Sequence, residues 1–243
     1  MNIPAVLGAA GIITLAALAQ ATTGFGFSLL AVPLLSLTAG PVDAVVGSSV
    51  LAVLLNAVAV TRDHTEVRWR TARTVLLAGV AGLPFGLLAL ILLPARVLTM
   101  LIAVCVLGGT VAIWRGLRIR AGRTAMATAG FLSGVLTTAT GVNGPPMAAA
   151  FTAMGLPPRQ FRATLAAVFV VVGPIGVAGF VLAGRFTTDS LIIAAAGLPA
   201  VAAGWWAGDR LFGRLTDPAR FRTVVLCGLT AASVTTLLRA AFA

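Results

Sequence analysis

The feature that most constrains this chain is a series of apolar blocks, each about long enough to cross a lipid bilayer as a helix. A helical span needs about 20 predominantly apolar residues. Only 9% of the 243 residues are charged, against about 25% in an average soluble domain. Eight blocks of 17–22 residues occur, at 5–23, 42–60, 74–93, 98–114, 124–140, 163–184, 190–208 and 223–241. The sequence therefore predicts an all-α, polytopic membrane protein with a single membrane domain over residues 1–243.

The basic excess of the chain indicates membrane topology rather than nucleic-acid binding. All 17 residues counted as Lys or Arg are arginine, the net charge is +11, and most of the arginines lie in short loops between apolar blocks. Cytoplasmic loops of membrane proteins carry such an excess. The predicted partners are therefore a lipid bilayer and no nucleic acid. The N-terminus lacks the positive start of a cleaved signal peptide, so we expect the first block to be retained.

The chain also repeats itself. Two shorter apolar stretches, 25–40 and 145–157, follow the first and fifth blocks directly, with only a glycine-rich break between. Four short matches recur in the same order: 21–24 with 138–141, 40–41 with 157–158, 81–84 with 196–199, and 94–96 with 218–220. Self-similarity at a fixed spacing is the mark of a duplicated unit. We predict internal repeats at approximately 5–114 and 124–241.

The distribution of arginine indicates how the two repeats lie in the membrane. If 5–40 and 124–157 each cross once, the two faces hold ten and seven arginines. If each is a hairpin that returns to its starting side, fourteen share one face and only Arg96, Arg185 and Arg239 lie opposite. A strong bias of arginine between short loops is typical of the two faces of a membrane protein. The hairpin arrangement, with fourteen against three, shows this bias and is therefore favoured. Each repeat is then a broken or re-entrant hairpin plus three transmembrane helices, the repeats are inverted, and both termini face the periplasm or the outside.

The tips of these hairpins are the candidate binding site. Glycine allows a backbone to approach a ligand closely, and a helix start aims free amides and a positive dipole end at an anion. The alternative is that these glycines serve only helix packing or flexible turns. Inverted repeats with interrupted helices in matching positions favour a substrate site near the membrane midplane. The candidate residues at the tips are Thr23, Gly24, Gly26, Ser28, Thr140, Gly141, Asn143, Gly144 and Pro145.

Polar side chains elsewhere in the apolar blocks are few. Asn56 lies in the second block, and Gln20 lies one turn before the first tip. A buried amide costs free energy unless it is paired, so Asn56 and Asn143 are better candidates than the hydroxyls. Gln160 and Arg162 stand where the sixth block begins. Arg162 either attracts an anion at the cytoplasmic mouth or is an ordinary topology arginine, and the sequence leaves both interpretations open.

Residues for enzymatic chemistry are scarce. The single histidine, His64, lies in a charged loop, and the six acidic residues lie in loops or at block ends. Phosphate-binding loops of the Walker type are absent from the sequence. The two cysteines lie inside apolar blocks, which implies neither a disulfide nor a metal site. We expect no enzymatic activity, no cofactor and no metal.

The glycine motifs resemble those of the TauE/SafE family of sulfite and organosulfonate exporters. The resemblance rests on 24–28 followed by Pro33, on Ser133-Gly134 followed by 141–146, and on 155–157 and 161–164. It covers essentially the whole chain. Two departures, a Gly-Phe-Gly in place of a glycine run and Asn143 within the second run, leave the identity of the substrate open.

The resemblance implies a carrier in the bacterial inner membrane that exports sulfite or sulfonate-type anions, driven by ion gradients. The hypothesis is alternating-access transport of a small anion between the two tips. Two alternatives stay open: a passive anion channel and a non-transporting scaffold subunit. The sequence also leaves open whether the chain acts alone or as a homo-oligomer.

Overall fold

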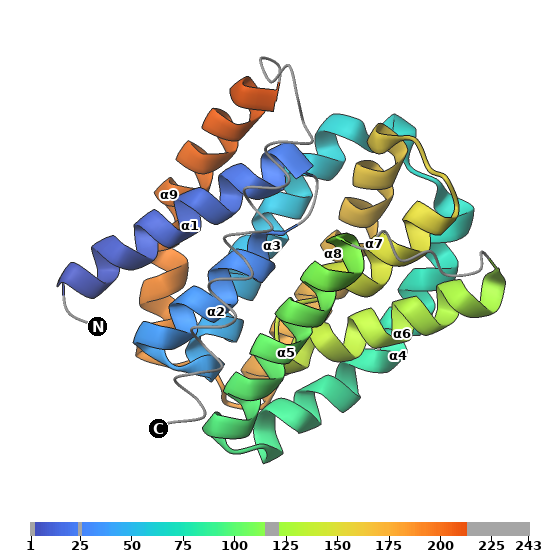
Figure 1. Ribbon diagram of the computed structural model, residues 1–243. Helices are drawn as coiled ribbons and strands as arrows, with labels where there is room; N and C mark the ends of the chain where they lie inside the picture. Colours follow the sequence, from blue (N-terminus) through green and yellow to red (C-terminus); the bar gives the residue numbers. More distant parts are fainter. Residues whose placement is uncertain (1–2, 24–25, 115–121, 213–243) are drawn as a thin grey trace.

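The computed structural model describes residues 3–23, 26–114 and 122–212, and this part of the chain is helical (Figure 1). The described residues form nine α-helices and one short 3-10 helix: α1 (Ile3–Thr23), α2 (Phe27–Ala39), α3 (Pro41–Asp63), η1 (His64–Glu66), α4 (Trp69–Leu92), α5 (Ala95–Trp114), α6 (Arg123–Ala139), α7 (Gly144–Ala153), α8 (Pro158–Leu182) and α9 (Thr188–Phe212). Each apolar block predicted within these ranges coincides with one helix, and the block at 223–241 lies outside them.

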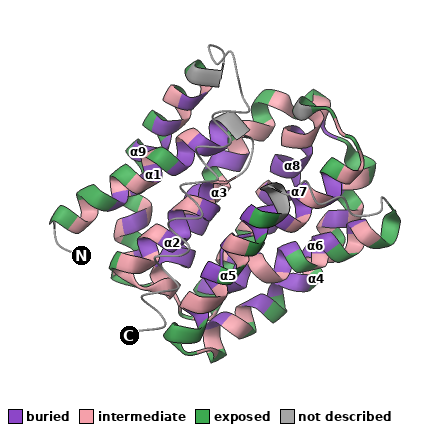
Figure 2. Ribbon diagram, viewed as in Figure 1, coloured by how far each residue is buried: buried purple, intermediate pink, exposed green. Residues whose placement is uncertain are grey.

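Five of the described helices are long and apolar enough to cross a membrane, and they contain Pro4–Ala21, Pro41–Glu66, Trp69–Leu92, Arg159–Leu182 and Thr188–Arg210. Two shorter apolar helices span Phe27–Ala39 and Ala95–Val111. Large apolar side chains such as Leu77, Leu92 and Leu182 stay exposed on the outside of the bundle, and Figure 2 shows the exposed residues along its outer helices. An apolar exterior of this kind suits lipid rather than water. The prediction of an all-α, polytopic membrane protein is confirmed.

The helices end at the predicted glycine breaks. Gly26, with φ of 112°, precedes α2, and Gly141, with φ of 68°, lies between α6 and α7. Residues with a side chain rarely adopt this left-handed region, so glycine stops one helix and re-aims the chain. Gly40 and Gly155, with φ of 85° and 65°, end the segments that carry α2 and α7. Each of the two segments thus follows one glycine with a positive φ and ends at another.

Glycine also sets the closest helix pairs. On α4, a Cβ added to Gly82 or Gly86 would overlap the backbone of α6, and one added to Gly134 on α6 would overlap Gly79. The pair α1 and α9 is joined in the same way, since Gly204 and Gly208 lie against the α1 backbone. Small residues four apart allow membrane helices to approach closely. These contacts pair residues in ascending order on both helices, so α4 runs parallel to α6 and α1 runs parallel to α9.

The central helices α3 and α8 run in opposite directions. Gly47 of α3 contacts Ile193 of α9, and Leu51 contacts Gly197, so α3 and α9 are parallel. Gly173 of α8 contacts Val53 of α3, whereas the start of α8 lies at η1, beyond the end of α3. In the same way Gly176 and Gly179 of α8 lie against Leu83 and Leu87 of α4, which makes α8 and α4 parallel.

Two directions therefore account for these helices: α1, α3 and α9 run one way, and α4, α6 and α8 run the other. Because α1 and α3 run in the same direction, the chain must return between them, and α2 is the segment that returns. The same reasoning assigns the return between α6 and α8 to α7.

Charged side chains tie the helix ends together. At one end Arg62 of α3 forms an ion pair of 2.6 Å with Asp209 of α9. The Nε of Arg68 donates to Oε1 of Gln160 at 2.8 Å, which joins the starts of α4 and α8. At the other end Thr187 donates to Asp43, and Arg185 donates to the carbonyl of Ile91 at 3.2 Å. Most arginines of the described helices thus lie at the first end, where α3 and α9 finish and α4 and α8 begin.

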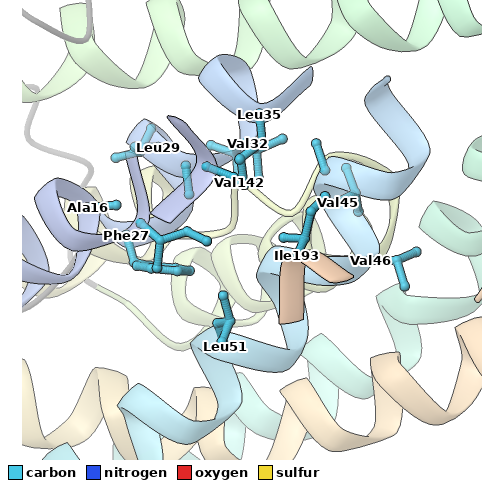
Figure 3. Packing of buried hydrophobic residues seen from close by; sticks show 14 of the residues in the cluster. Ala16, Phe27, Leu29, Val32, Leu35, Val45, Val46, Leu51, Val142 and Ile193 are labelled. Atoms are coloured by element: carbon cyan, nitrogen blue, oxygen red, sulfur yellow. The ribbon is translucent and has the colours of Figure 1, made fainter. Parts of the chain in front are cut away.

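Two apolar clusters fill the interior. The first joins α1, α2, α3 and α5 with residues of α8 and α9, and the second joins α4, α6, α7 and α8. Val142, from the break before α7, belongs to the first cluster. Figure 3 shows it beside Val32 of α2. The second break is thus packed into the core formed mainly by the first five helices.

Candidate functional site

Two buried carboxamides, those of Gln20 and Asn56, line a pocket between the two helix breaks. The pocket is small, with a cavity volume of about 30 Å³, and part of it is open to solvent. Its lining residues come from both breaks and from two central helices: Gln20, Gly26, Phe27, Ser28, Leu29, Ala52, Asn56, Val142, Asn143, Gly144 and Phe169. Ala52 is the middle residue of α3 (Pro41–Asp63), and Phe169 lies near the middle of α8 (Pro158–Leu182). The pocket therefore lies at mid-depth in the bundle.

A hydrogen-bond relay connects the start of α2 with α1 and α3. The backbone N–H of Phe27 donates to Oε1 of Gln20 at 3.3 Å, and Nε2 of Gln20 donates to Oδ1 of Asn56 at 3.4 Å. The Nδ2 of Asn56 then donates to the carbonyl of Ala52 at 2.7 Å. Since a backbone N–H can only donate and a carbonyl can only accept, the relay sets the orientation of both carboxamides.

The relay also leaves hydrogen-bonding capacity in the pocket. A carboxamide nitrogen carries two hydrogens, and the relay uses one from Gln20 and one from Asn56. Both side chains are buried, with 7% and 6% of their surface exposed. A buried donor favours a partner, and both residues line the pocket. Among the bonds of the described residues, the second hydrogen of each nitrogen lies outside the relay, which suits it to an oxygen of a bound ligand.

The second break is held by hydroxyl groups of α6. The Oγ of Ser133 donates to the carbonyl of Asn143 at 2.9 Å, and Nδ2 of Asn143 donates to Oγ1 of Thr137 at 3.3 Å. Thr140 accepts the N–H of Val142 at 3.2 Å and donates to the carbonyl of Leu136 at 3.0 Å. These bonds satisfy polar groups where the helix is interrupted, as the interior of a membrane protein requires.

The two helix starts at the pocket differ in the donors that they offer. The first amides of a helix have no acceptor within it. At the start of α2 the N–H groups of Ser28 and Leu29 are of this kind, whereas that of Phe27 is bonded to Gln20. At the start of α7 two prolines, Pro145 and Pro146, follow Gly144, and proline has no N–H. The α2 start thus offers more backbone donors, and α7 contributes chiefly Gly144 and the side chain of Asn143.

Comparison with known proteins assigns the chain to a family. The family model for the sulfite exporter TauE/SafE matches residues 9–236, nearly the whole length. The chain belongs to the TauE/SafE family. TauE/SafE proteins are membrane transporters, so the expectation of a multi-pass transporter rather than an enzyme is confirmed. No match was found among curated proteins or among solved structures.

In this TauE/SafE chain the structure brings five of the sequence-predicted residues together around the pocket: Gly26, Ser28, Asn56, Asn143 and Gly144. Thr140 and Gly141 shape the second break without lining the pocket. Pro145 lies against Gly109 of α5. Gly24 and the side chain of Thr23 lie outside what the structure describes.

Gln160 and Arg162 lie away from the pocket. Gln160 accepts the hydrogen bond from Arg68 at the arginine-rich end, and Arg162 is one turn or less along α8. Neither lines the pocket between the breaks. Their predicted contact with a substrate stays a prediction, one that concerns the end of the bundle rather than its centre.

The lining residues outside the predicted site are Gln20, Phe27, Leu29, Ala52, Val142 and Phe169. Gln20 had a visible signal, because it is the only carboxamide in the first apolar block. Phe169 had none, because it is one of several large apolar residues in a continuous run. Its place opposite the breaks follows from the contact between α3 and α8, which no local pattern encodes.

Proposed function

We propose that the protein exports a small sulfur oxyanion, sulfite or an organosulfonate, across the bacterial inner membrane by alternating access at the pocket between the breaks. The observation that carries this proposal is that two breaks more than a hundred residues apart in the sequence line one pocket at mid-depth. Membership of the TauE/SafE family supports the class of substrate.

The donors around the pocket suit an oxyanion. The oxygens would accept hydrogen bonds from the carboxamides of Gln20, Asn56 and Asn143 and from the amides of Ser28 and Gly144. Two helix starts face the same space, and the positive end of a helix dipole favours negative charge. Half-helix starts that point at an anionic group near the midplane are a recurring arrangement in secondary transporters.

We further infer that the two halves of the chain are inverted repeats. Corresponding helices would be α1 with α6, α3 with α8 and α4 with α9. The support is the order of contacts, in which each member of these pairs runs opposite to its counterpart. The packing partners also exchange, since α1 lies on α9 and α6 lies on α4. Such symmetry provides two related conformations, one open to each side.

The arginine-rich end is proposed to face the cytoplasm. Arg62, Arg68 and Arg210 lie there, with the start of α8 and its two arginines. Orientation follows arginine and lysine in short loops. The N-terminus would then face the periplasm, and the basic end would raise the local concentration of anions at the cytoplasmic mouth.

Counterflow in proteoliposomes tests the proposal. Vesicles preloaded with unlabelled sulfite or methanesulfonate should take up the labelled anion faster than empty vesicles, because a carrier exchanges its substrate. A conductance without this acceleration would indicate a channel, and the lack of any flux would favour a scaffold subunit; either result would refute the carrier.

A matched pair of variants links the flux to the pocket. Asn56→Leu removes a lining amide and should abolish exchange while insertion into the membrane is retained. Thr128→Leu makes a similar polar-to-apolar change at an exposed position of α6 that does not line the pocket, and it should leave exchange intact. Equal loss in both variants would argue against the pocket as the binding site.

A further inference from the structure

We propose that Asp63 of α3 and Arg162 of α8 form an ionic gate that closes the pocket toward the arginine-rich end of the bundle. This inference rests on the proposed function, because a gate is needed only if the pocket opens to each side in turn. It goes beyond that function by assigning the two residues whose contact controls access from one side. The assignment follows from the way in which α3 and α8 meet.

The contact between α3 and α8 fixes which of their residues face each other. A Cβ added to Gly173 of α8 would lie 2.7 Å from Cγ2 and 3.9 Å from Cβ of Val53, so these two residues lie directly opposite each other. The two helices run in opposite directions and are in extensive contact. Residues that follow Val53 on α3 therefore lie opposite residues that precede Gly173 on α8.

One face of α8 is directed at α3. Residues three and four apart lie on the same face of a helix, and this spacing leads from Gly173 back through Phe169 and Ala166 to Arg162. Phe169 lines the pocket, and Ala166 is buried. Arg162, which is half-buried, is thus the charged end of the face that meets α3.

The facing stripe on α3 also ends in a charge. The same spacing leads from Val53 forward through Asn56 and Val60 to Asp63. Asn56 lines the pocket, and Val60 packs against the second apolar cluster, to which α8 contributes. Asp63 is ten residues beyond Val53, and Arg162 is eleven residues before the glycine opposite Val53. The acid and the arginine therefore lie at matching positions.

The start of α8 is held to α4 by its other face. The N–H of Arg68 donates to Oγ1 of Thr164 at 3.1 Å, and its Nε donates to Oε1 of Gln160 at 2.8 Å. Arg162 lies midway between these two residues in the sequence, and residues two apart on a helix do not share a face. Its side chain therefore starts from the face away from α4.

The neighbouring charges leave Asp63 as the partner of Arg162. Arg162 lies within electrostatic range of two acids, Asp63 and Asp209. Asp209 already forms the 2.6 Å ion pair with Arg62, which joins α9 to α3. Contact between Asp63 and Arg162 would instead join α3 to α8, the helices that supply Ala52, Asn56 and Phe169 to the pocket.

The position of the pair along the helices suits a gate. Asp63 lies seven residues beyond Asn56, and Arg162 lies seven residues before Phe169. Seven residues of helix correspond to about 10 Å. Val60 and Ala166 occupy the layer between the pocket and the charges. Contact of the opposite charges, which attract, would bring the two helix ends together and close this apolar layer, and their separation would open it.

Access to the pocket from the arginine-rich side tests the gate without any substrate. In a variant without native cysteines, Ala52→Cys places a thiol at the pocket wall. An impermeant thiol reagent is then applied to inside-out membrane vesicles, which expose the cytoplasmic face. Arg162→Ala and Asp63→Asn should each speed labelling about fivefold, because loss of an ion pair shifts the population toward the open state. The charge-reversed pair, Asp63→Arg with Arg162→Asp, should restore the slow rate.

Arg73→Ala is the matched control. Arg73 lies in the first turns of α4 at the same end and is exposed, so its loss removes the same charge without changing the contact between α3 and α8. Labelling in this variant should equal that of the parent. Equal acceleration by Arg73→Ala and Arg162→Ala would overturn the gate, and so would a charge-reversed pair that labels as fast as the single variants.

A disulfide decides the question if a charge variant does not fold. Val60→Cys with Ala166→Cys would join α3 to α8 between the pocket and the gate. Once the loss of free thiols shows that the bond has formed, counterflow should stop, and reduction should restore it. Counterflow that is unaffected by this bond would overturn the gate. Absence of counterflow in the wild-type protein would overturn the proposed function instead, and the labelling rates would still decide the gate.

Discussion

Replacing Gly141 by alanine should weaken the second break and the pocket beside it. Gly141 has φ of 68°, and a residue with a side chain in this region costs about 1–2 kcal/mol. An added Cβ would also lie 3.1 Å from Cγ2 of Val32 on α2, which is closer than ordinary van der Waals contact. Overpacking of this kind typically adds about 1 kcal/mol or more. The expected loss of stability is therefore about 2–3 kcal/mol.

Gly155 provides a matched control. Its φ of 65° is nearly the same, but an added Cβ there has nothing within 4 Å. Gly155→Ala should therefore cost only the backbone contribution, about 1–2 kcal/mol. The difference between the two variants, about 1 kcal/mol, isolates the contact of the second break with α2. Since Val32 supplies the crowded methyl group, Val32→Ala combined with Gly141→Ala should recover that difference in a double-mutant cycle.

The assay combines thermal unfolding of the purified protein with counterflow, measured per amount of folded protein. Gly141→Ala should unfold at a lower temperature than Gly155→Ala and should exchange anions more slowly, because the crowded break lies directly before the pocket residues Val142 and Asn143. Equal behaviour of the two variants in both measurements would refute the reasoning. So would a double mutant in which Val32→Ala gives no relief.

Two further predictions concern the bundle. In a variant without native cysteines, a cysteine at exposed Thr65 should be labelled by impermeant thiol reagents only from the cytoplasmic side, and one at exposed Ala95 only from the opposite side. Labelling of both from one side would contradict the proposal that α4, which separates them, crosses the membrane. Gly134→Ala should strongly lower the unfolding temperature, because the added Cβ would overlap the carbonyl of Gly79. Gly108→Ala is the control: it has open space around it, and alanine favours a helix by about 1 kcal/mol over glycine, so it should not lower the unfolding temperature. Similar melting of both variants would show that α4 and α6 do not depend on their glycine contact.

Much of the architecture was predictable because it depends on residues that lie close together in the sequence. A membrane helix must satisfy its own backbone and present apolar residues over its length, so composition marks where helices lie. The breaks were visible for a similar reason, since Gly26 and Gly141 adopt φ values that few other residues tolerate. The arginine count predicted that the segments containing α2 and α7 return to their starting side. That the two halves are inverted repeats stays a proposal, and the order of contacts along α1, α3, α6 and α8 supports it.

The members of the pocket were predictable only in part. Asn56 and Asn143 were singled out because a buried amide needs a partner, and the structure places both at the pocket. Gln160 was grouped with them by polarity alone, yet it pairs with Arg68 at the end of the bundle. Polarity tells that a side chain needs a partner, but not which one it will meet.

By itself the sequence determined the class of the protein, its helices and the two interruptions, because these depend on residues close together in the chain and on the demands of lipid. Only the tertiary structure decided that the interruptions meet. That meeting depends on glycine contacts between distant helices, such as Gly134 with Gly79, and on the relay that joins Gln20 of α1 to Asn56 of α3. Contacts of this kind depend on how whole helices pack, and a local pattern does not contain that information.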